Sequence, residues 1–419
     1  MLTKIISFFT SIIVAICSLL GINYPKTGRV LDCEKLESAI SSSQNARIAD
    51  GKLTGSIVVI RQDGKSLLSR AYGKSSENGE EMDMNATFRI ASMTKPITAA
   101  AMLIAYDMGL LDIYADVADY LPEFSEMYIE KKDTDGNSLR DSNGKIVRGE
   151  KAENRIKVYQ TVSHVSGLQE VEVNFSEYEN FTVSDAVAYI ASQPLKFEPG
   201  SAQSYCTSGF DIVARIIEIK SGMEFEKFLD KYIFSKLGMT DTTFAPSEEQ
   251  FSRMVAVHAR DDSGKAYDAP VADGCVMGNY PVSYQAAGAG LMSTAGDYVK
   301  FAEMLLNNGK APDGTQILSE SSVKLLQTPI PDMKNGIMNG SVQWGLGVRV
   351  ITDNRYTLPK GTYGWSGAYG THFWIDPLNK VIAVYMKNSA YDGGAGAATG
   401  SELEKDVMKS FSRTKLTDE

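Results

Sequence analysis

Strand-like segments stand at both ends of this chain, and the residues between them follow helical spacing. Near the N-terminus, residues 55–73 predict two β-strands joined at Asp63-Gly64, a dipeptide that adopts the positive φ angles of a tight hairpin turn. Near the C-terminus, HFWI and VIAVYM flank the turn DPLNK and predict a second hairpin. Apolar residues at helical spacing dominate residues 156–240. This order favours an α+β fold in which N- and C-terminal strands share one sheet around an inserted helical region.

Three further segments refine this picture. The Ala- and Leu-rich run from Thr94 to Leu111 predicts a largely buried helix that Gly109 is placed to end. Residues 130–155 are charged and punctuated by Gly and Asn, which indicates an exposed hairpin or loop. A charged helix is expected at about 401–412.

Composition excludes several classes of function. A chain of 419 residues with 43% hydrophobic residues can bury a substantial core without a metal or a disulfide staple. Its net charge is -10, and its Lys and Arg residues are not clustered in a way that could bind the phosphates of a nucleic acid. We therefore expect no nucleic-acid partner. Three histidines and four cysteines without a CxxC pair cannot assemble the usual zinc signatures, so we expect no metal or other cofactor and free thiols. The cysteines are Cys17, Cys33, Cys206 and Cys275.

The N-terminal segment is expected to be an export signal or an anchor. Residues 5–22 contain no charged residue, a length that suits either the core of a signal peptide or a short membrane-spanning helix. We therefore expect residues 1–24 to be a signal peptide or membrane anchor, with cleavage and retention both open. The protein would be periplasmic, secreted or tethered to a membrane.

Four Ser-x-x-K tetrapeptides occur, and they differ in context. Those that begin at Ser142, Ser321 and Ser412 lie in the polar insertion, in a short solvated helix and in the terminal tail. Only Ser92 and Lys95 follow a strand-like segment and open a buried helix, where the spacing i, i+3 places both side chains on one face. The positive helix N-terminus also favours a developing oxyanion, so the pair can activate a serine without a histidine. The alternative to catalysis is that Ser92 only caps the helix and that Lys95 is exposed to solvent.

Several segments resemble one known family, the serine β-lactamase and penicillin-binding-protein superfamily in its class C and family VIII carboxylesterase branch. The segments are FRIASMTKPITAAAMLIAYDMGLLD, DYLPEF, SHVSGL, LGMTDTTF and GAGLMSTAGDYVKF. The resemblance runs over residues 55–388 and implies a single catalytic domain over 30–415. It also implies an antiparallel sheet flanked by helices, with a sheet subdomain at about 50–95 and 285–412 and a helical subdomain at about 96–284.

The family's second motif, Tyr-x-Asn, is matched by Tyr205-Cys206-Thr207. The resemblance implies that Tyr205 and Lys95 share the general-base role toward Ser92 and that Tyr205 later protonates the leaving group; which of the two is the base stays open. Thr207 departs from the expected amide, so a substrate contact there is weaker or differently shaped. Cys206 is expected to be a small packed residue.

The third motif, normally Lys-Thr-Gly or His-Thr-Gly on a strand edge, is matched by Trp365-Ser366-Gly367. A neutral tryptophan replaces the cation or donor that receives a substrate carboxylate, which favours neutral esters over β-lactams. The resemblance places an oxyanion hole at the backbone amides of Ser92 and Ala368. Simple core packing is the alternative role for Trp365.

The three histidines are expected outside the catalytic group. His164 is expected to be structural and His258 to lie on the surface, while His372, on the strand after the third motif, is placed to border the pocket.

The predicted protein is a serine hydrolase that forms an acyl-enzyme on Ser92 and acts on a small-molecule ester or amide, with neutral carboxylic esters favoured. Rival hypotheses are a class C-like β-lactamase or D-alanyl-D-alanine carboxypeptidase, an acyltransferase, and a non-catalytic binder of peptides or cell-wall fragments.

Overall fold

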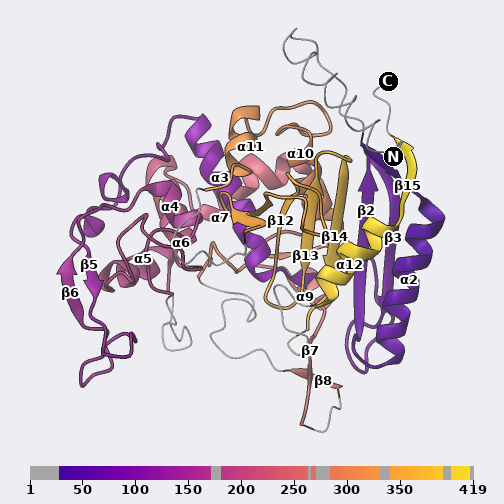
Figure 1. Ribbon diagram of the computed structural model, residues 1–419, viewed down its shortest axis with the longest axis horizontal. Coiled ribbons are helices and arrows are strands. Elements are labelled where there is room, and N and C mark those ends of the chain that lie inside the picture. The colour runs from indigo at the N-terminus through magenta and orange to yellow at the C-terminus, as the bar shows by residue number, and fades with distance from the viewer. Residues whose placement is uncertain are drawn as a thin grey trace, which may run out of the picture.

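A seven-stranded antiparallel sheet forms the centre of the described chain (Figure 1). The computed structural model describes residues 28–170, 181–262, 266–269, 284–330, 340–389 and 398–415. The strand order is β10-β11-β12-β13-β14-β2-β3. Strands β2 (Gly55–Gln62) and β3 (Lys65–Gly73) join the C-terminal strands through β14 (Val381–Met386), so both ends of the chain contribute to one sheet, as predicted.

The two predicted hairpins are present. Asp63 and Gly64 have φ angles of 49° and 71°, which a tight turn between β2 and β3 requires. The C-terminal hairpin pairs β14 with β13 (His372–Asp376). The remaining strands of the sheet are β10 (Val342–Trp344), β11 (Arg349–Ile351) and β12 (Tyr363–Ser366).

Side chains alternate between the two faces of the sheet, and each face carries its own apolar cluster. In β14, Ala383 and Tyr385 join one cluster while Ile382 and Val384 join the other. Helices α2 (Cys33–Ala49) and α12 (Ala398–Lys409) contribute to the first cluster, and α3 (Thr94–Asp107) and α10 (Ala295–Leu306) to the second. The period of two along a strand accounts for this division.

A mainly helical region extends from the α3 side of the sheet (Figure 1). Its helices are α4 (Val158–Val162), α5 (Val183–Ser192), α6 (Gly209–Ser221), α7 (Phe225–Leu229), α8 (Ser235–Leu237), α9 (Glu248–Ser252) and, after α10, α11 (Glu320–Leu326). The charged insertion forms an exposed hairpin between β5 (Tyr128–Glu130) and β6 (Arg148–Lys151), as predicted.

Six short strands pair two by two outside the central sheet. Strand β4 (Phe88–Arg89) pairs with β9 (Met292–Ser293), and β7 (Val257–Arg260) with β8 (Ala266–Ala269). The terminal strands β1 (Arg29–Leu31) and β15 (Phe411–Lys415) also pair. Ser412, which was expected in the terminal tail, lies in β15, because this segment pairs with β1.

The N-terminal segment and two of the four cysteines lie outside the part of the chain that the structure describes. The predicted signal peptide or anchor lies outside the described residues, as do Cys17 and Cys275. Among the described helices, none combines the length and the apolar composition that crossing a membrane requires. Cys33 and Cys206 are both free thiols, the first exposed and the second buried.

Candidate active site

Ser92 lies in a tight turn between a strand and a helix. Strand β4 ends at Arg89, a 3₁₀ turn (η1) spans Ala91–Met93, and α3 begins at Thr94. Ala91 is fully buried and adopts a φ of 46°, a left-handed conformation that a non-glycine residue keeps only where its surroundings enforce it. The turn leaves Ser92 partly exposed at the N-terminal end of the buried helix.

Lys95 lies one turn further along the same helix and is fully buried. Its Nζ donates to Ser92 Oγ at 3.1 Å, to Thr207 Oγ1 at 3.2 Å and to the Gly288 carbonyl at 2.8 Å. No ion pair joins Lys95 to a carboxylate within the described ranges. Neutral oxygen atoms therefore hold the amine beside the serine.

Tyr205 comes from a segment 113 positions away in the sequence and completes the group. Its hydroxyl donates to Ser92 Oγ at 2.9 Å and accepts a hydrogen bond from Trp365 Nε1 at 3.2 Å. The Lys95 Nζ also lies 4.8 Å from the centre of the Tyr205 ring. The structure thus brings together the hydroxyl, the amine and the phenol that the sequence singled out.

His164 supports the Tyr205 segment from behind. It is fully buried, its ring lies 4.4 Å from the Tyr205 ring, and its Nδ1 accepts from the Cys206 amide at 3.1 Å. Burial, with the nearby Lys95 charge, holds the pKa of His164 well below its usual value, so the ring is neutral and accepts a hydrogen bond. The expected structural role agrees with these contacts.

Cys206 is a packed residue, as expected. It is fully buried, and burial raises the pKa of its thiol to about 12. Its Sγ donates to the Gln169 carbonyl at 3.4 Å. The thiol is therefore uncharged at neutral pH and helps to fasten the Tyr205 segment.

Trp365 and Ser366 end β12 and Gly367 follows, at a place where no other described strand pairs with β12 on the β11 side. Strand β11 pairs with β12 only as far as Gly364, so Trp365 and Ser366 extend beyond it. A Cβ at Gly367 would lie 2.4 Å from the Ile90 carbonyl, so only glycine permits this approach to the chain that leads into Ser92.

Ala368 is exposed, and its amide donates no backbone hydrogen bond to another described residue. It follows directly on Gly367, whose backbone packs against the segment before Ser92. A free amide at this place can receive an acceptor from a substrate.

Two groups that the sequence did not single out also hold the site together. The Gly288 carbonyl accepts from Lys95, and a Cβ at Gly288 would lie 2.5 Å from Thr207 Cγ2, so a glycine is required there. The Glu170 carboxylate accepts from the Thr207 amide at 2.5 Å. Gly288 begins one of the segments that carried the resemblance, which is a signal that could have found it; Glu170 has no such signal.

Asp211 positions the segment that carries the Gly288 carbonyl. The carboxylate is buried and accepts from the Ala287 amide at 2.9 Å and from the Tyr284 hydroxyl at 2.5 Å. Thr98, on the helix of Lys95, donates to the Ala287 carbonyl at 2.6 Å. Burial raises the pKa of Asp211 to about 7.

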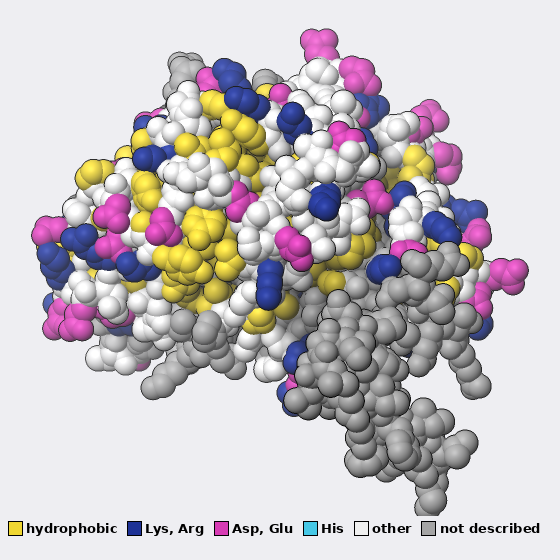
Figure 2. Space-filling view, turned by 90° about the horizontal axis from the view of Figure 1, so that it is seen from above, with side chains coloured by type: hydrophobic (Ala, Val, Ile, Leu, Met, Phe, Trp, Pro, Cys, Tyr) yellow, Lys and Arg dark blue, Asp and Glu magenta, His cyan; other side chains and the backbone are white. Residues whose placement is uncertain are grey.

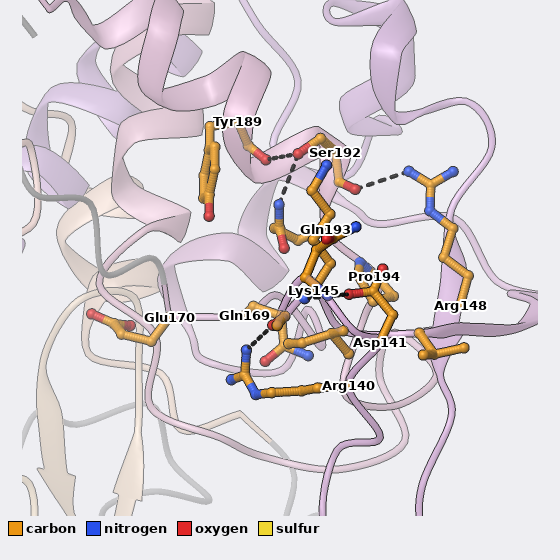
Figure 3. A pocket seen from close by; sticks show the side chains of 14 residues that line it. Arg140, Asp141, Lys145, Arg148, Gln169, Glu170, Tyr189, Ser192, Gln193 and Pro194 are labelled. Atoms are coloured by element: carbon orange, nitrogen blue, oxygen red, sulfur yellow. Dashed lines mark hydrogen bonds between the residues drawn. The ribbon is translucent and has the colours of Figure 1, made fainter.

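A cavity of about 1000 Å³ has Gln169 and Glu170 in its lining (Figure 3). One wall is the exposed hairpin, with Arg140, Lys145 and Arg148, and the other is the C-terminal end of α5. Glu170 lines the cavity and also accepts from the Thr207 amide, so it links the cavity to the candidate catalytic group. Ser92 itself does not line it.

The burial of His258 differs from the expectation. It was expected on the surface, but it is only 2% exposed, and its Nδ1 lies 3.1 Å from Asp268 Oδ1. The pairing of β7 with β8 covers it, a contact that the polar sequence around it does not reveal. In the described ranges, no three His, Cys, Asp or Glu side chains are arranged to hold a metal ion.

Comparison with known proteins decides the family. The model of the family described as Beta-lactamase matches residues 41–404. The chain belongs to this family. It shares the mixed α/β architecture of the family's structures, an antiparallel sheet flanked by helices. Membership identifies it with the serine hydrolases of the β-lactamase fold, which include esterases.

Three relatives illustrate the match. Protein Rv1367c of Mycobacterium tuberculosis is 29% identical over 381 residues, covering 85% of this chain and 92% of its own. Esterase EstB of Burkholderia gladioli is 25% identical over 402 residues, covering 88% and 94%. The solved structure of EstCE1, described as a hydrolase with promiscuous acyltransferase activity, superposes with a TM-score of 0.73 at 19% identity, covering 90% of this chain and 99% of the other.

Proposed function

We propose that this protein is a serine hydrolase that forms an acyl-enzyme on Ser92 and acts on neutral carboxylic esters. The observation that carries the proposal is the convergence on Ser92 Oγ of the Tyr205 hydroxyl at 2.9 Å and the Lys95 amine at 3.1 Å. Two proton-transferring groups within hydrogen-bond reach of a partly exposed hydroxyl satisfy the geometry of an activated nucleophile.

The reaction follows from these contacts. Ser92 Oγ attacks the ester carbonyl carbon while its proton passes to the Tyr205 and Lys95 pair, and a tetrahedral oxyanion forms. The C–O bond to the alcohol then breaks, and the leaving oxygen takes up the proton. In the second half a water molecule attacks the acyl carbon and gives its proton to the same pair. The bond from the acyl carbon to Ser92 Oγ then breaks, the pair returns the proton to Oγ, and the carboxylic acid leaves.

The oxyanion would be received by the amides of Ser92 and Ala368. The Ala368 amide is unpaired among the described residues, and the close approach of Gly367 to Ile90 keeps β12 beside the Ser92 turn. Removal of one such donor typically slows acyl transfer about 10²- to 10³-fold.

Trp365 supports esters over substrates that carry a carboxylate. Its indole N–H donates a hydrogen bond to the Tyr205 hydroxyl, and the side chain carries no charge. A charge-assisted hydrogen bond to a carboxylate, about 1.5–3 kcal/mol, is therefore absent at this position. The relative named Esterase EstB supports the same choice.

Transfer of the acyl group to an alcohol is the second candidate. The chemistry of the acyl-enzyme is the same, with an alcohol in place of water, and the structural neighbour EstCE1 is described as a hydrolase with promiscuous acyltransferase activity. Product analysis in the presence of an added alcohol separates the two, because transfer yields a new ester and hydrolysis a free acid.

The test uses Ser92→Ala and Ser321→Ala. Ser321 also begins an S-x-x-K on a helix but is exposed, so it is a matched control. Hydrolysis of 4-nitrophenyl acetate and labelling by a fluorophosphonate should be lost in Ser92→Ala, with kcat reduced by at least about 10³-fold, and should be unchanged in Ser321→Ala.

Two outcomes would contradict the proposal. A wild-type protein that a fluorophosphonate does not label would support a non-catalytic binder. Equal turnover of a chromogenic cephalosporin and the nitrophenyl ester would favour a β-lactamase.

A further inference from the structure

His164 contacts the chain on both sides of Tyr205. The Ser204 amide donates to the His164 carbonyl at 2.9 Å, and the Cys206 amide donates to His164 Nδ1 at 3.1 Å. The imidazole also lies 4.4 Å from the Tyr205 ring, at an interplanar angle of 31°. One residue therefore holds the residue before Tyr205, the residue after it and the ring itself.

The segment around Tyr205 has no regular structure to fix it. Residues 203–206 lie in neither a helix nor a strand, and α6 begins only at Gly209. The place of the phenol therefore depends on individual contacts, and a shift of the main chain at either neighbour would move it. A misplacement of about 1 Å at a reacting group can cost about 10²-fold in rate.

His164 is itself anchored in the core. It is fully buried and lies two residues after the end of α4. The residue between, Ser163, is also fully buried, and its Oγ donates to the Tyr159 carbonyl of α4 at 2.9 Å. The contacts of His164 therefore connect the irregular Tyr205 segment to a helix.

Two features of His164 cost free energy. Its φ of 64° is a left-handed conformation, which is uncommon for residues other than glycine. Its Nδ1 accepts, so the neutral ring carries its hydrogen on Nε2, and this buried Nε2 has no hydrogen-bond partner among the described residues. Strained and unsatisfied groups persist where the surrounding structure enforces them, and they cluster at functional sites. With this backbone, the carbonyl and the ring of one residue both reach the Tyr205 segment.

The position of the Tyr205 hydroxyl matters most when the alcohol leaves. Lys95 lies on α3 and contacts Ser92 directly, so a shift of the Tyr205 segment leaves that contact in place. Lys95 is also fully buried, whereas Tyr205 is partly exposed. Tyr205 is therefore the member of the pair that can reach a leaving oxygen. As the C–O bond breaks, its hydroxyl has to deliver the proton that came from Ser92.

We propose that His164 is a positioning residue that holds the Tyr205 hydroxyl within reach of the leaving oxygen, so that the enzyme can cleave esters of ordinary alcohols, whose oxygen must be protonated as it leaves. This inference rests on the proposed function and deepens it. It gives His164 a part in catalysis that acts through Tyr205, beyond packing.

The experiment compares benzyl acetate with 4-nitrophenyl acetate. Both esters give the same acetyl-enzyme, but 4-nitrophenolate leaves without a proton, whereas benzyl alcohol needs one. The measured quantity is the ratio of kcat/KM for benzyl acetate to that for 4-nitrophenyl acetate. His164→Gly keeps the left-handed backbone and its carbonyl but removes the ring, and the ratio should fall about tenfold or more.

A conservative variant should restore most of the ratio. In His164→Asn the side-chain Oδ1 is bonded to Cγ, as Nδ1 is in histidine, and asparagine tolerates the left-handed conformation. It can accept from the Cys206 amide but lacks the ring that packs on Tyr205. The ratio in His164→Asn should therefore lie two- to threefold below that of the wild type, well above that of His164→Gly.

Val165→Ala controls for a general loss of packing. Val165 is the next residue and is also fully buried. Its truncation should lower the unfolding temperature and leave the ratio of the two esters within about twofold of the wild type. A merely structural role of His164 would lower kcat/KM for both esters alike and would not change the ratio.

The outcomes separate this inference from the proposed function. A wild-type protein that turns over neither ester contradicts the hydrolase itself. Turnover of 4-nitrophenyl acetate alone, an unchanged ratio in His164→Gly, or a ratio as low in Val165→Ala or His164→Asn as in His164→Gly overturns the inference and leaves the hydrolase standing. Thermal unfolding identifies loss of folding. If His164→Gly does not fold, His164→Asn decides, and an unchanged ratio there overturns the inference.

Discussion

Trp365 contributes one hydrogen bond to the candidate catalytic group, from its Nε1 to the Tyr205 hydroxyl at 3.2 Å. Trp365→Phe keeps the aromatic ring and removes this donor. We expect kcat for 4-nitrophenyl acetate to fall about five- to tenfold with little change in KM, since a hydrogen bond of this kind contributes about 1 kcal/mol.

Trp344 offers a matched comparison for this change. Its ring lies 4.3 Å from that of Trp365, but its buried Nε1 has no hydrogen-bond partner in the described part of the chain. Trp344→Phe should therefore leave kcat within about twofold, although the smaller ring lowers the unfolding temperature. Equal losses of kcat in the two variants would mean that ring packing, and not the indole N–H, matters.

The structure brings together the three side chains that the sequence singled out. Ser92 and Lys95 were singled out by their motif and its context, and Tyr205 by the family resemblance. The Gly288 carbonyl was missed because every residue has a carbonyl, and Glu170 because one carboxylate among many carries no sequence signature. His258 was misplaced for a related reason, since its burial depends on a strand pairing.

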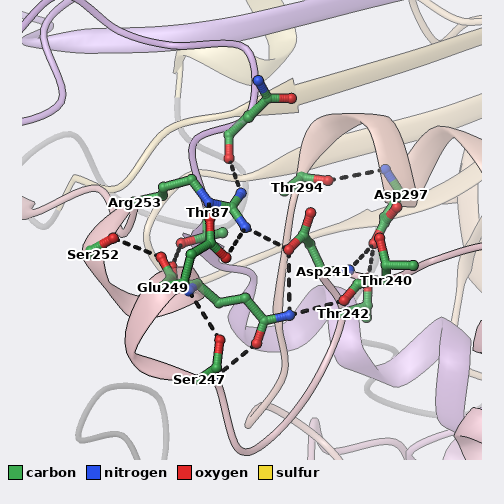
Figure 4. Close-up of polar contacts among 12 residues, drawn as sticks. Thr87, Thr240, Asp241, Thr242, Ser247, Glu249, Ser252, Arg253, Thr294 and Asp297 are labelled. Atoms are coloured by element: carbon green, nitrogen blue, oxygen red, sulfur yellow. Dashed lines mark hydrogen bonds and ion pairs between the residues drawn. The ribbon is translucent and has the colours of Figure 1, made fainter.

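At the scale of elements, the Ser92 turn is held by groups on several segments. Arg253, just after α9, donates to Asp241 at 2.6 Å, to Glu249 at 2.8 Å and to the Asn85 carbonyl at 2.5 Å (Figure 4). Thr87 donates to the Gln250 carbonyl at 3.0 Å. These bonds fasten the chain that enters β4, so the strand delivers Ser92 at a fixed place.

Helix α6 fixes the Lys95 pocket through Asp211, and this contact should appear in the pH dependence of stability. The pKa of Asp211 is raised to about 7 in the folded chain, against about 4 when unfolded. Between these values the folded state binds a proton that the unfolded state does not. The contribution of this group to stability is thus complete below about pH 4 and is lost as the pH rises through about 7.

Asp211→Asn removes that titration. Urea denaturation gives the free energy of unfolding of the wild type and of Asp211→Asn at each pH. The wild-type value minus the Asp211→Asn value should fall by roughly 2–3 kcal/mol between about pH 5 and about pH 8. A difference that stays constant, or that grows with pH, would show that Asp211 is ionised throughout this range. Loss of kcat at all pH values in the same variant would add evidence that Asp211 positions the Gly288 carbonyl.

On the scale of the whole molecule, the central sheet and the helical region carry the site between them, and the exposed hairpin is peripheral. Ser92 lies in the turn before α3 and Lys95 in the first turn of α3, while Tyr205 precedes α6 and Trp365 lies near the end of β12. On the face shown in Figure 2, Lys and Arg side chains lie among Asp and Glu side chains without a continuous basic stripe. The hairpin projects from the far end of the helical region (Figure 1).

Shortening this hairpin tests its role. Replacement of residues 133–145 by a Gly-Asn-Gly turn removes mostly exposed side chains and should change the free energy of unfolding by about 1 kcal/mol or less. It also removes Arg140 and Lys145 from the cavity wall. We expect kcat/KM for a short acetate ester to stay within about twofold, while esters with long polar acyl groups change more.

Parallel measurements decide the interpretation. Thermal unfolding and a panel of acyl-chain lengths should be recorded for the wild type and the shortened chain. A large loss of activity on the acetate ester would show that the hairpin supports the Ser92 group and is not merely a wall of the neighbouring cavity.

The sequence by itself determined the α+β order, both hairpins and the buried α3 helix, because periodicity is a local property. The spacing of Ser92 and Lys95, and the family resemblance at Tyr205, predicted that these three side chains act together. Only the tertiary structure decided which main-chain carbonyl holds Lys95, where β12 extends beyond β11, and that Ser366, His372 and Glu404 lie in one series of buried contacts. Those features depend on burial and on distances between segments that are far apart in the chain. Burial also strengthens the hydrogen bonds between these segments, because water is removed from them.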